Sequence, residues 1–130
     1  AKVREGFQEL ILQPQSDLPH FRHFLAEIGW EIVSEEMIKE DGKFYPMMKA
    51  VRNESGKKIS YTEEEAWFGP LLLRECHPVL KEYLLRETAI REKILAGLLS
   101  APSESAKARL AEVKEEMELI DSALKRYESI

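Results

Sequence analysis

The chain has 130 residues, of which 44% are hydrophobic and 33% are charged, and its formal net charge at pH 7 is −5. This composition is typical of a soluble domain with a hydrophobic core, and the negative charge argues against nucleic-acid binding by bulk charge, although not against a local basic patch. The first residues lack the regions of a signal peptide, no run approaches about eighteen apolar residues, and the single cysteine, Cys76, fits a reducing compartment. We therefore expect a cytoplasmic protein without a membrane span.

The first predicted elements are a short strand and a helix. Residues 10–12 form an apolar run, and Pro14 ends the strand because proline cannot donate a hydrogen bond to a neighbouring strand. Ser16 or Asp17 can cap a helix that has Pro19 in its first turn. The apolar residues of this helix fall on one face at helical spacing: Leu18, Phe21, Leu25 and Ile28.

Two more strands are predicted after Gly29, which suits a helix terminus. Residues 30–38 predict the second strand, with an irregularity at Ser34-Glu35, and residues 44–51 predict the returning strand after a turn at Asp41-Gly42. Because two strands joined by a crossover helix are parallel and right-handed, the third strand should run antiparallel to the first two. Three strands are few for a free-standing sheet, so residues 1–60 look like part of a larger one.

Residues 61–130 are predicted to form a separate helical domain. Thr62 opens a capping box, Gly69-Pro70 breaks that short helix, and His77-Pro78 starts a long one. The long helix carries an apolar stripe interrupted by Glu87: Leu80, Tyr83, Leu84, Ile90, Ile94 and Leu98. After a connection at 100–103, the last helix has a heptad seam: Ala106, Leu110, Val113, Met117, Ile120, Leu124 and Tyr127. Such helices should pack as an antiparallel coiled-coil hairpin.

The first helix of this hairpin is the more basic one, since residues 79–99 hold four basic and three acidic residues, whereas 103–130 hold five and seven. A charged face of this kind is usually only solvated. If any part of the chain binds the phosphates of an RNA, the candidates are Arg74, Lys81, Arg86, Arg91 and Lys93.

Three stretches resemble a known family: "LILQPQ" at 10–15, "EIGWEIVSEEMIKEDGKFYPMMKAV" at 27–51 and "FGPLLLRE" at 68–75. They are similar to the C-terminal half of the bacterial tRNA adenine-N1 methyltransferases that act on adenosine 22. The resemblance implies a class I methyltransferase that uses S-adenosylmethionine and acts on tRNA, with a Rossmann-like domain followed by a coiled coil. Residues 10–51 would then be the last three strands, with the final strand antiparallel between the other two.

The resemblance also implies that the cofactor site lies outside this chain. The glycine-rich S-adenosylmethionine site of the family precedes the position of Ala1, and the six glycines of the chain include no close pair from which such a loop could form. We expect a fragment that neither methylates nor binds the cofactor tightly.

The candidate substrate site is Gln13, Pro14 and Gln15, at the carboxyl end of the first strand, where open α/β sheets bind ligands. Amide side chains can hydrogen-bond the Watson–Crick edge of an extruded base. The alternative, that both glutamines satisfy backbone groups of the turn, stays open, and the family has asparagine where Gln15 stands. No catalytic residue is assigned, because N1 of adenine has a free lone pair and transfer mainly requires positioning.

Other patterns predict less. His20 and His23 lie at helical spacing, but no carboxylate or cysteine cluster completes a metal site. Cys76 and His77 are adjacent, which is unsuitable for a nucleophilic dyad. Core packing is favoured over base stacking for the aromatic residues Trp30, Trp67 and Phe68.

The alternative function is a coiled-coil interaction module, without catalytic activity, whose seam binds a partner helix or a second copy. The length of the two helices argues partly against it, since they can cover each other within one chain. The sequence does not fix the oligomeric state, and a monomer is compatible with it.

Overall fold

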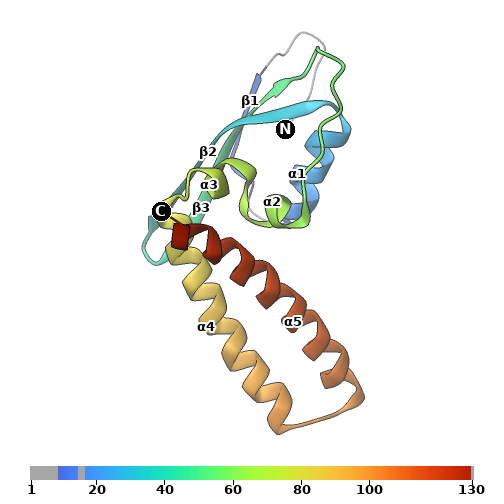
Figure 1. The fold of residues 1–130 in the computed structure, drawn as a ribbon, viewed down its shortest axis with the longest axis vertical. Coiled ribbons are helices and arrows are strands. Elements are labelled where there is room, and N and C mark those ends of the chain that lie inside the picture. The colour runs from blue at the N-terminus through green and yellow to red at the C-terminus, as the bar shows by residue number, and fades with distance from the viewer. Residues whose placement is uncertain (1–8, 15–16, 130) are drawn as a thin grey trace.

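The computed structural model describes residues 9–14 and 17–129, so Gln15 and Ser16 lie outside the described residues. Figure 1 shows a small sheet with one helix against it and two long helices that extend away from it. The elements, in chain order, are β1 (Glu9–Leu12), α1 (Leu18–Glu27), β2 (Trp30–Glu40), β3 (Lys43–Arg52), α2 (Glu63–Phe68), α3 (Pro70–Arg74), α4 (Pro78–Ser100), α5 (Glu104–Lys125) and a final 3-10 helix, η1 (Arg126–Ser129).

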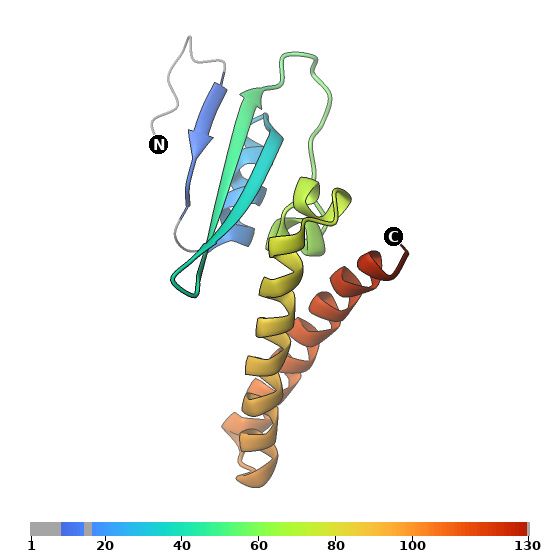
Figure 2. The same ribbon diagram turned by 90° about the vertical axis from the view of Figure 1, so that its left-hand side faces the viewer.

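The sheet has the strand order β1-β3-β2, and both outer strands pair antiparallel with β3. β1 and β2 are therefore parallel to each other, and the last strand lies between them, as predicted. Leu12 pairs with Met48 in the middle of β3, and β1 runs antiparallel to β3, so the carboxyl end of β1 points toward the turn between β2 and β3. Figure 2 shows β1 at one border of the sheet.

A β-bulge in β2 determines which side chains enter the protein. The register shifts between Ile32 and Ser34, next to the predicted irregularity. Trp30 and Ile32 are buried before the bulge, and Glu35 and Met37 are buried after it. Strict alternation from Trp30 would have buried Ser34, but the extra residue changes the phase and turns the Glu35 carboxylate inward.

Two hydrophobic clusters form the core. One joins α1 to the sheet and consists of Leu12, Leu25, Trp30, Ile32, Met48 and Ala50. The other lies where the helices meet β2 and consists of Met37, Phe68, Leu72, Leu73, Leu80, Leu84, Ile120 and Ala123. Leu71 packs against the first cluster, and Met37 belongs to the second, so the sheet and the helices share apolar contacts.

The buried ion pair Arg22–Glu35 joins four elements between these clusters. Arg22 Nη2 and Nε donate to Glu35 Oε2 at 3.1 Å and 3.3 Å, and Arg22 Nη1 donates to the carbonyl oxygen of Ala66 at 2.7 Å. Glu35 Oε1 accepts from the amides of Leu71 at 2.8 Å and Leu72 at 3.4 Å. The pair therefore ties α1 and β2 to α2 and to the first turn of α3.

Burial raises the pKa of the Glu35 carboxyl, and the charge of Arg22 and the two α3 amides oppose that rise. Burial likewise lowers the pKa of the Arg22 guanidinium, against the opposing charge of Glu35. Each charge thus depends on its partner for compensation inside the protein.

The connection from α2 to α3 follows the predicted chemistry. The Thr62 hydroxyl accepts from the amide of Glu65 at 3.1 Å, and the Glu65 carboxylate accepts from the amide of Thr62 at 2.9 Å, which confirms the capping box. Gly69 separates the two helices with φ of 98°. The apolar run after Pro70, for which the sequence predicted no helix, forms α3.

The long helices α4 and α5 contact each other and are joined by residues 101–103. The Ser103 hydroxyl caps α5 by accepting from the amide of Ala106 at 3.1 Å. Within the predicted seam Val113 and Ile120 are buried. Coiled-coil packing in the strict sense remains a prediction.

One position of the α4 stripe was predicted wrongly, because Ile90 is 40% exposed. The neighbouring Arg91 is less exposed: its Nη1 lies 2.9 Å from Glu87 Oε1, and its Nε lies 3.0 Å from Glu116 Oε1 on α5. A polar contact between the helices thus replaces the apolar contact expected at this level.

Replacing Gly69 by alanine should destabilise the protein. A Cβ atom at this position would lie 2.7 Å from Glu35 Oε2 and 2.8 Å from Oε1, and φ of 98° is strained for any L residue. Glu35 cannot move away from the added Cβ atom without breaking its hydrogen bonds to Arg22 and to the amides of α3. Urea unfolding should show a loss of about 2 kcal/mol or more. The control G97A, in open space on α4, should gain up to about 1 kcal/mol; equal midpoints for the two variants would contradict this.

Replacing Arg22 by methionine should cost about 3 to 5 kcal/mol of unfolding free energy, because the Glu35 charge stays buried without its cation. Urea unfolding measures the loss, and the double variant R22M/E35Q should recover part of it, since glutamine still accepts from α3. The control is R109M, which breaks an exposed contact of 2.9 Å with Glu112 and should cost less than about 1 kcal/mol. Similar losses in R22M and R109M would disprove the structural role of the buried pair.

Candidate functional site

A pocket of about 250 Å³ lies where β1 ends, between the sheet and the helices α2 and α4. The predicted residues Gln13 and Pro14 line it, whereas Gln15 lies outside the described residues. The wall is formed largely by aromatic side chains of β3, α2 and α4: Phe44, Tyr45, Trp67, Phe68 and Tyr83. The pocket thus combines one amide side chain at the end of a strand with several apolar ring surfaces.

The charged residue in the described lining of this pocket, Arg22, is bound by other groups of the protein. Its side chain is only 1% exposed and is bound by Glu35 and Ala66. Burial raises the pKa of Tyr83, so its hydroxyl stays neutral near pH 7. The described lining contains no histidine or free carboxylate, so its groups are suited to holding a planar ring and not to moving a proton.

The aromatic residues take different positions. Trp30 and Phe68 are 2% and 3% exposed, which confirms the prediction that they are core residues. Trp67 is only half-buried, packs edge-to-face on Phe68 with ring centroids 6.2 Å apart, and also lines the pocket. A structural and a ligand-facing role are therefore both open to Trp67.

The predicted RNA-binding residues do not form one patch. Arg86 lies over the Phe44 ring at 5.0 Å and donates to the carbonyl of Gly42 at 3.2 Å, so it joins α4 to the β2–β3 turn. Lys81 lies 5.9 Å from the Tyr127 ring, and Arg74 is exposed at the end of α3. Arg91 is held between two carboxylates, as described above. Lys93 is exposed farther along α4.

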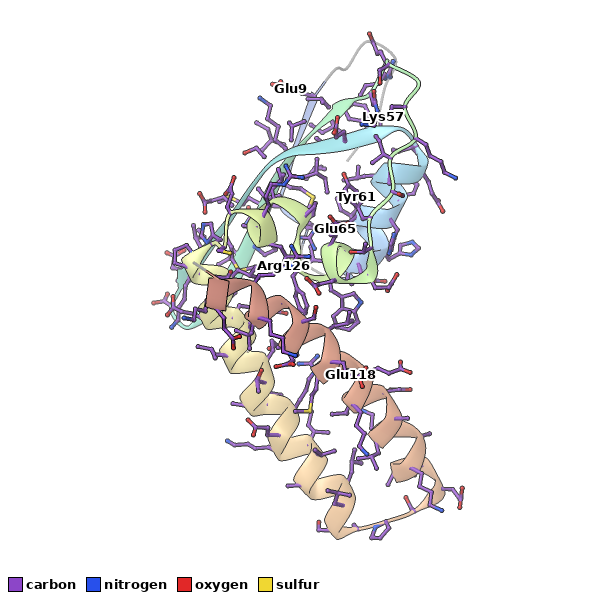
Figure 3. All side chains as sticks on the ribbon, in the orientation of Figure 1. Glu9, Lys57, Tyr61, Glu65, Glu118 and Arg126 are labelled. Carbon is purple, nitrogen blue, oxygen red and sulfur yellow. The ribbon has the colours of Figure 1, made fainter. Side chains whose placement is uncertain are left out.

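The groove between α2 and α5 has the opposite charge. It has a volume of about 610 Å³, and Glu118, labelled in Figure 3, lies on the α5 side. Six glutamates line it: Glu63, Glu64, Glu112, Glu115, Glu116 and Glu118. Arginines offset part of this charge, since Glu64, Glu112 and Glu116 each form an ion pair with one. The remaining carboxylates make the groove less favourable for phosphate than the α4 side of the hairpin.

Two of the three histidines, His23 and His77, and the cysteine have structural partners. His23 Nε2 lies 2.9 Å from Glu63 Oε1. His77 caps α4 by accepting from the amide of Val79 at 3.2 Å, and its other ring nitrogen contacts Glu36. Cys76 Sγ lies 3.6 Å from the carbonyl oxygen of Arg126.

Within residues 9–14 and 17–129, no group of three or more potential ligands could hold a metal ion. Over the same residues, no helix combines the length and the apolar character that crossing a bilayer requires.

The Arg22–Glu35 pair was not predicted from the sequence. A signal was present for Arg22, because it falls on the apolar face of its helix between Leu18 and Leu25. For Glu35 the signal depended on the exact position of the bulge. The lysine pair Lys57-Lys58, in the loop before α2, was not singled out from the sequence either. Both lysines line a surface depression that Arg74 of α3 also lines.

Comparison with known proteins gives consistent matches. The family model TrmK, described as tRNA (adenine(22)-N(1))-methyltransferase, matches residues 2–122. The tRNA (adenine(22)-N(1))-methyltransferase of Bacillus subtilis is 26% identical over 122 residues, which are 92% of this chain and 51% of that protein. The chain thus spans about half the length of this relative.

Solved structures agree in fold. An uncharacterized protein from Listeria monocytogenes matches with a TM-score of 0.86 and 28% identity, over 92% of this chain and 52% of that chain. A Streptococcus pneumoniae protein solved in complex with S-adenosyl-L-methionine matches with a TM-score of 0.76 and 23% identity, over 92% and 49% of the two chains. Because the family model covers nearly all of its residues, this chain belongs to the TrmK family of tRNA (adenine(22)-N(1))-methyltransferases.

Proposed function

We propose that this chain is the C-terminal part of an S-adenosylmethionine-dependent tRNA adenine-N1 methyltransferase. In that enzyme it supplies the substrate-side end of a Rossmann-like sheet and a helical arm that holds the tRNA. The observation that carries the proposal is the family match over residues 2–122, in a chain whose pocket lies at the carboxyl end of β1.

The remainder of the enzyme would contain most of the cofactor site. The chain spans 51% of its Bacillus subtilis relative, and Ile11 on the border strand β1 is 81% exposed, as expected for a strand that another part of the protein covers. A structural relative holds S-adenosyl-L-methionine. We infer that the cofactor supplies the methyl group in the complete enzyme and that this part alone neither methylates nor binds it tightly. A cytoplasmic location remains our expectation.

The pocket fits the chemistry of this transfer. N1 of adenine carries a free lone pair, so the enzyme has to present the base in line with the methyl group and needs little proton transfer. Aromatic walls can hold an extruded base, and the Gln13 amide can bond its Watson–Crick edge. In this proposal Gln13 recognises the adenine and Pro14 fixes the turn; Gln15 would border the same pocket.

The test of this pocket is Q13A in the full-length enzyme. Losing one hydrogen bond to the base should lower kcat/KM for methylation of adenosine 22 by about fivefold to tenfold, with little change in thermal stability. The control is H20A, an exposed position of α1 outside the pocket lining. If Q13A lowers the melting temperature but leaves kcat/KM unchanged, Gln13 serves only the turn.

The proposed arm uses the exposed cations of α3 and α4. Arg74 and Lys81 are exposed and can reach phosphates. Arg86 is also exposed, but it would have to exchange its contact with the Gly42 carbonyl for a phosphate, and Arg91 would act by holding α4 against α5. The acidic groove between α2 and α5 faces away from such a contact in this proposal, which orients the RNA toward α4.

Charge reversal of Lys81 and Arg86 to glutamate should weaken tRNA binding and make it less dependent on salt. Each lost phosphate contact should reduce the slope of log affinity against log salt concentration by about one. Fluorescence anisotropy with the full-length enzyme measures both quantities. The same reversal at Lys107 and Lys125, exposed on α5, is the control and should have a smaller effect. Equal effects of both pairs would refute a specific arm.

The alternative interaction module receives less support. Val113 and Ile120 are already covered within the chain, so little of the seam is available to a partner helix. Sedimentation of the full-length protein distinguishes the two functions, because a monomer with a folded hairpin leaves no seam free for a partner.

A further inference from the structure

A second depression, of about 410 Å³, lies between the loop after β3, the start of β2 and helix α3. Three cations line it: Lys57 and Lys58 from the loop and Arg74 from α3. None of their side chains has an ion-pair partner among the described residues, whereas Lys39, Lys49 and most arginines contact a carboxylate. Unpaired cations from two separate segments thus converge on one place.

The loop that carries the lysines is held in one conformation by Asn53. Its Nδ2 donates to the carbonyl of Lys57 at 3.1 Å, and its Oδ1 accepts from the amide of Ser55 at 3.1 Å. The backbone N–H of Asn53 donates to the carbonyl oxygen of Gly29 at 2.8 Å, which attaches the loop to the turn between α1 and β2. The two lysines therefore start from a fixed backbone, which reduces the entropy lost when they bind an anion.

Tyr61 adds a neutral donor to the same depression. Its oxygen accepts from the amide of Ile32 at 3.1 Å, which leaves its own O–H free to donate. Burial raises its pKa, so the hydroxyl keeps its proton near neutral pH. Figure 3 shows Lys57, Tyr61 and Glu65 in succession along the segment from β3 to α2.

Two carboxylates, Glu31 and Glu65, also line the depression and limit its charge. Glu65 is occupied by the amide of Thr62 in the capping box. Three cations against two carboxylates suit one singly charged oxyanion better than a polyphosphate. A phosphodiester has that charge, and it accepts hydrogen bonds from lysine, arginine and tyrosine.

We propose that this depression binds a backbone phosphate of the tRNA, an inference that rests on the proposed function. Strand β3 links it to the base pocket: Met48 pairs with Leu12 beside Gln13, and Asn53 follows the end of the strand. At about 3.3 Å per residue the two places are roughly 15 to 20 Å apart along the strand. One bound tRNA can place its target base in the base pocket and a backbone phosphate in the depression at that separation. The phosphate site would then fix the register of the RNA on the enzyme.

The test uses the full-length enzyme with the triple variant K57Q/K58Q/R74Q. The variant should bind tRNA about tenfold more weakly, and its salt slope should be shallower by about one. Fluorescence anisotropy over a range of KCl concentrations measures both. The control K107Q/K114Q/K125Q removes the same charge from α5 and should change affinity less than about twofold. Conversely, E31Q should strengthen tRNA binding, because it removes a carboxylate that faces the phosphate.

Two outcomes would overturn the site. In the first, the triple variant binds tRNA like the wild type; if it has then lost binding of inorganic phosphate, the depression is assigned to a free anion. In the second, it loses no more tRNA affinity than the α5 control. The substituted side chains are exposed, so folding should be preserved, as thermal unfolding can verify. If the wild type transfers no methyl group to tRNA, the proposed function itself fails; if it methylates and the triple variant binds normally, only the phosphate site fails.

Discussion

The carboxylate of Glu35 is the contact on which the arrangement of this protein depends. It reaches the interior because of the bulge in β2, and it is satisfied there by Arg22 from α1 and by two amides of α3. A buried ion pair adds little net stability compared with apolar residues of the same volume, but removing one partner is costly. Its value here is geometric, because only one placement of α2 and α3 on the sheet satisfies all of these groups. That placement positions Trp67 and Phe68 of α2 in the wall of the pocket at the end of β1.

Sequence patterns predicted most of the fold because the relevant signals are local. The capping box at Thr62, the turn at Gly42 and the order of the strands were all confirmed. The errors arose where partners are distant in sequence. Ile90 was placed in the helix interface, since the pattern could not show that Glu116 on α5 draws Arg91 there instead. For the candidate site, the strand-end position singled out Gln13 and Pro14, which line a pocket, and their role in binding a substrate stays a prediction. The aromatic walls come from three other elements and carry no shared motif.

The net charge of −5 conceals an uneven distribution of charge. The groove between α2 and α5 collects six glutamates, and many cations are neutralised by carboxylates, as Arg91 is by Glu116 of that groove and Lys49 is by Glu9 on the sheet. What remains positive and unpaired in the described residues includes the two lysines before α2 and the arginine that ends α3. Composition alone would discourage an RNA-binding role, whereas the pairing pattern shows where an RNA backbone could approach. The relevant quantity is therefore the local surplus of unpaired cations.

The pocket at the end of β1 and the cationic depression offer a ligand different kinds of groups. In the pocket at the end of β1 the guanidinium of Arg22 is fully engaged by Glu35 and Ala66, so the walls offer a ligand ring surfaces, the hydroxyls of Tyr45 and Tyr83 and the amide of Gln13. Such groups can orient a base, and none of them is a histidine or a carboxylate that could readily serve as a general base near neutral pH. Methylation at N1 of adenine makes little demand for a base, since the attacking lone pair is already free. A described lining without a histidine or a carboxylate is thus compatible with the proposed reaction, and binding energy gathered from phosphates elsewhere on the tRNA would be used to hold the base in line.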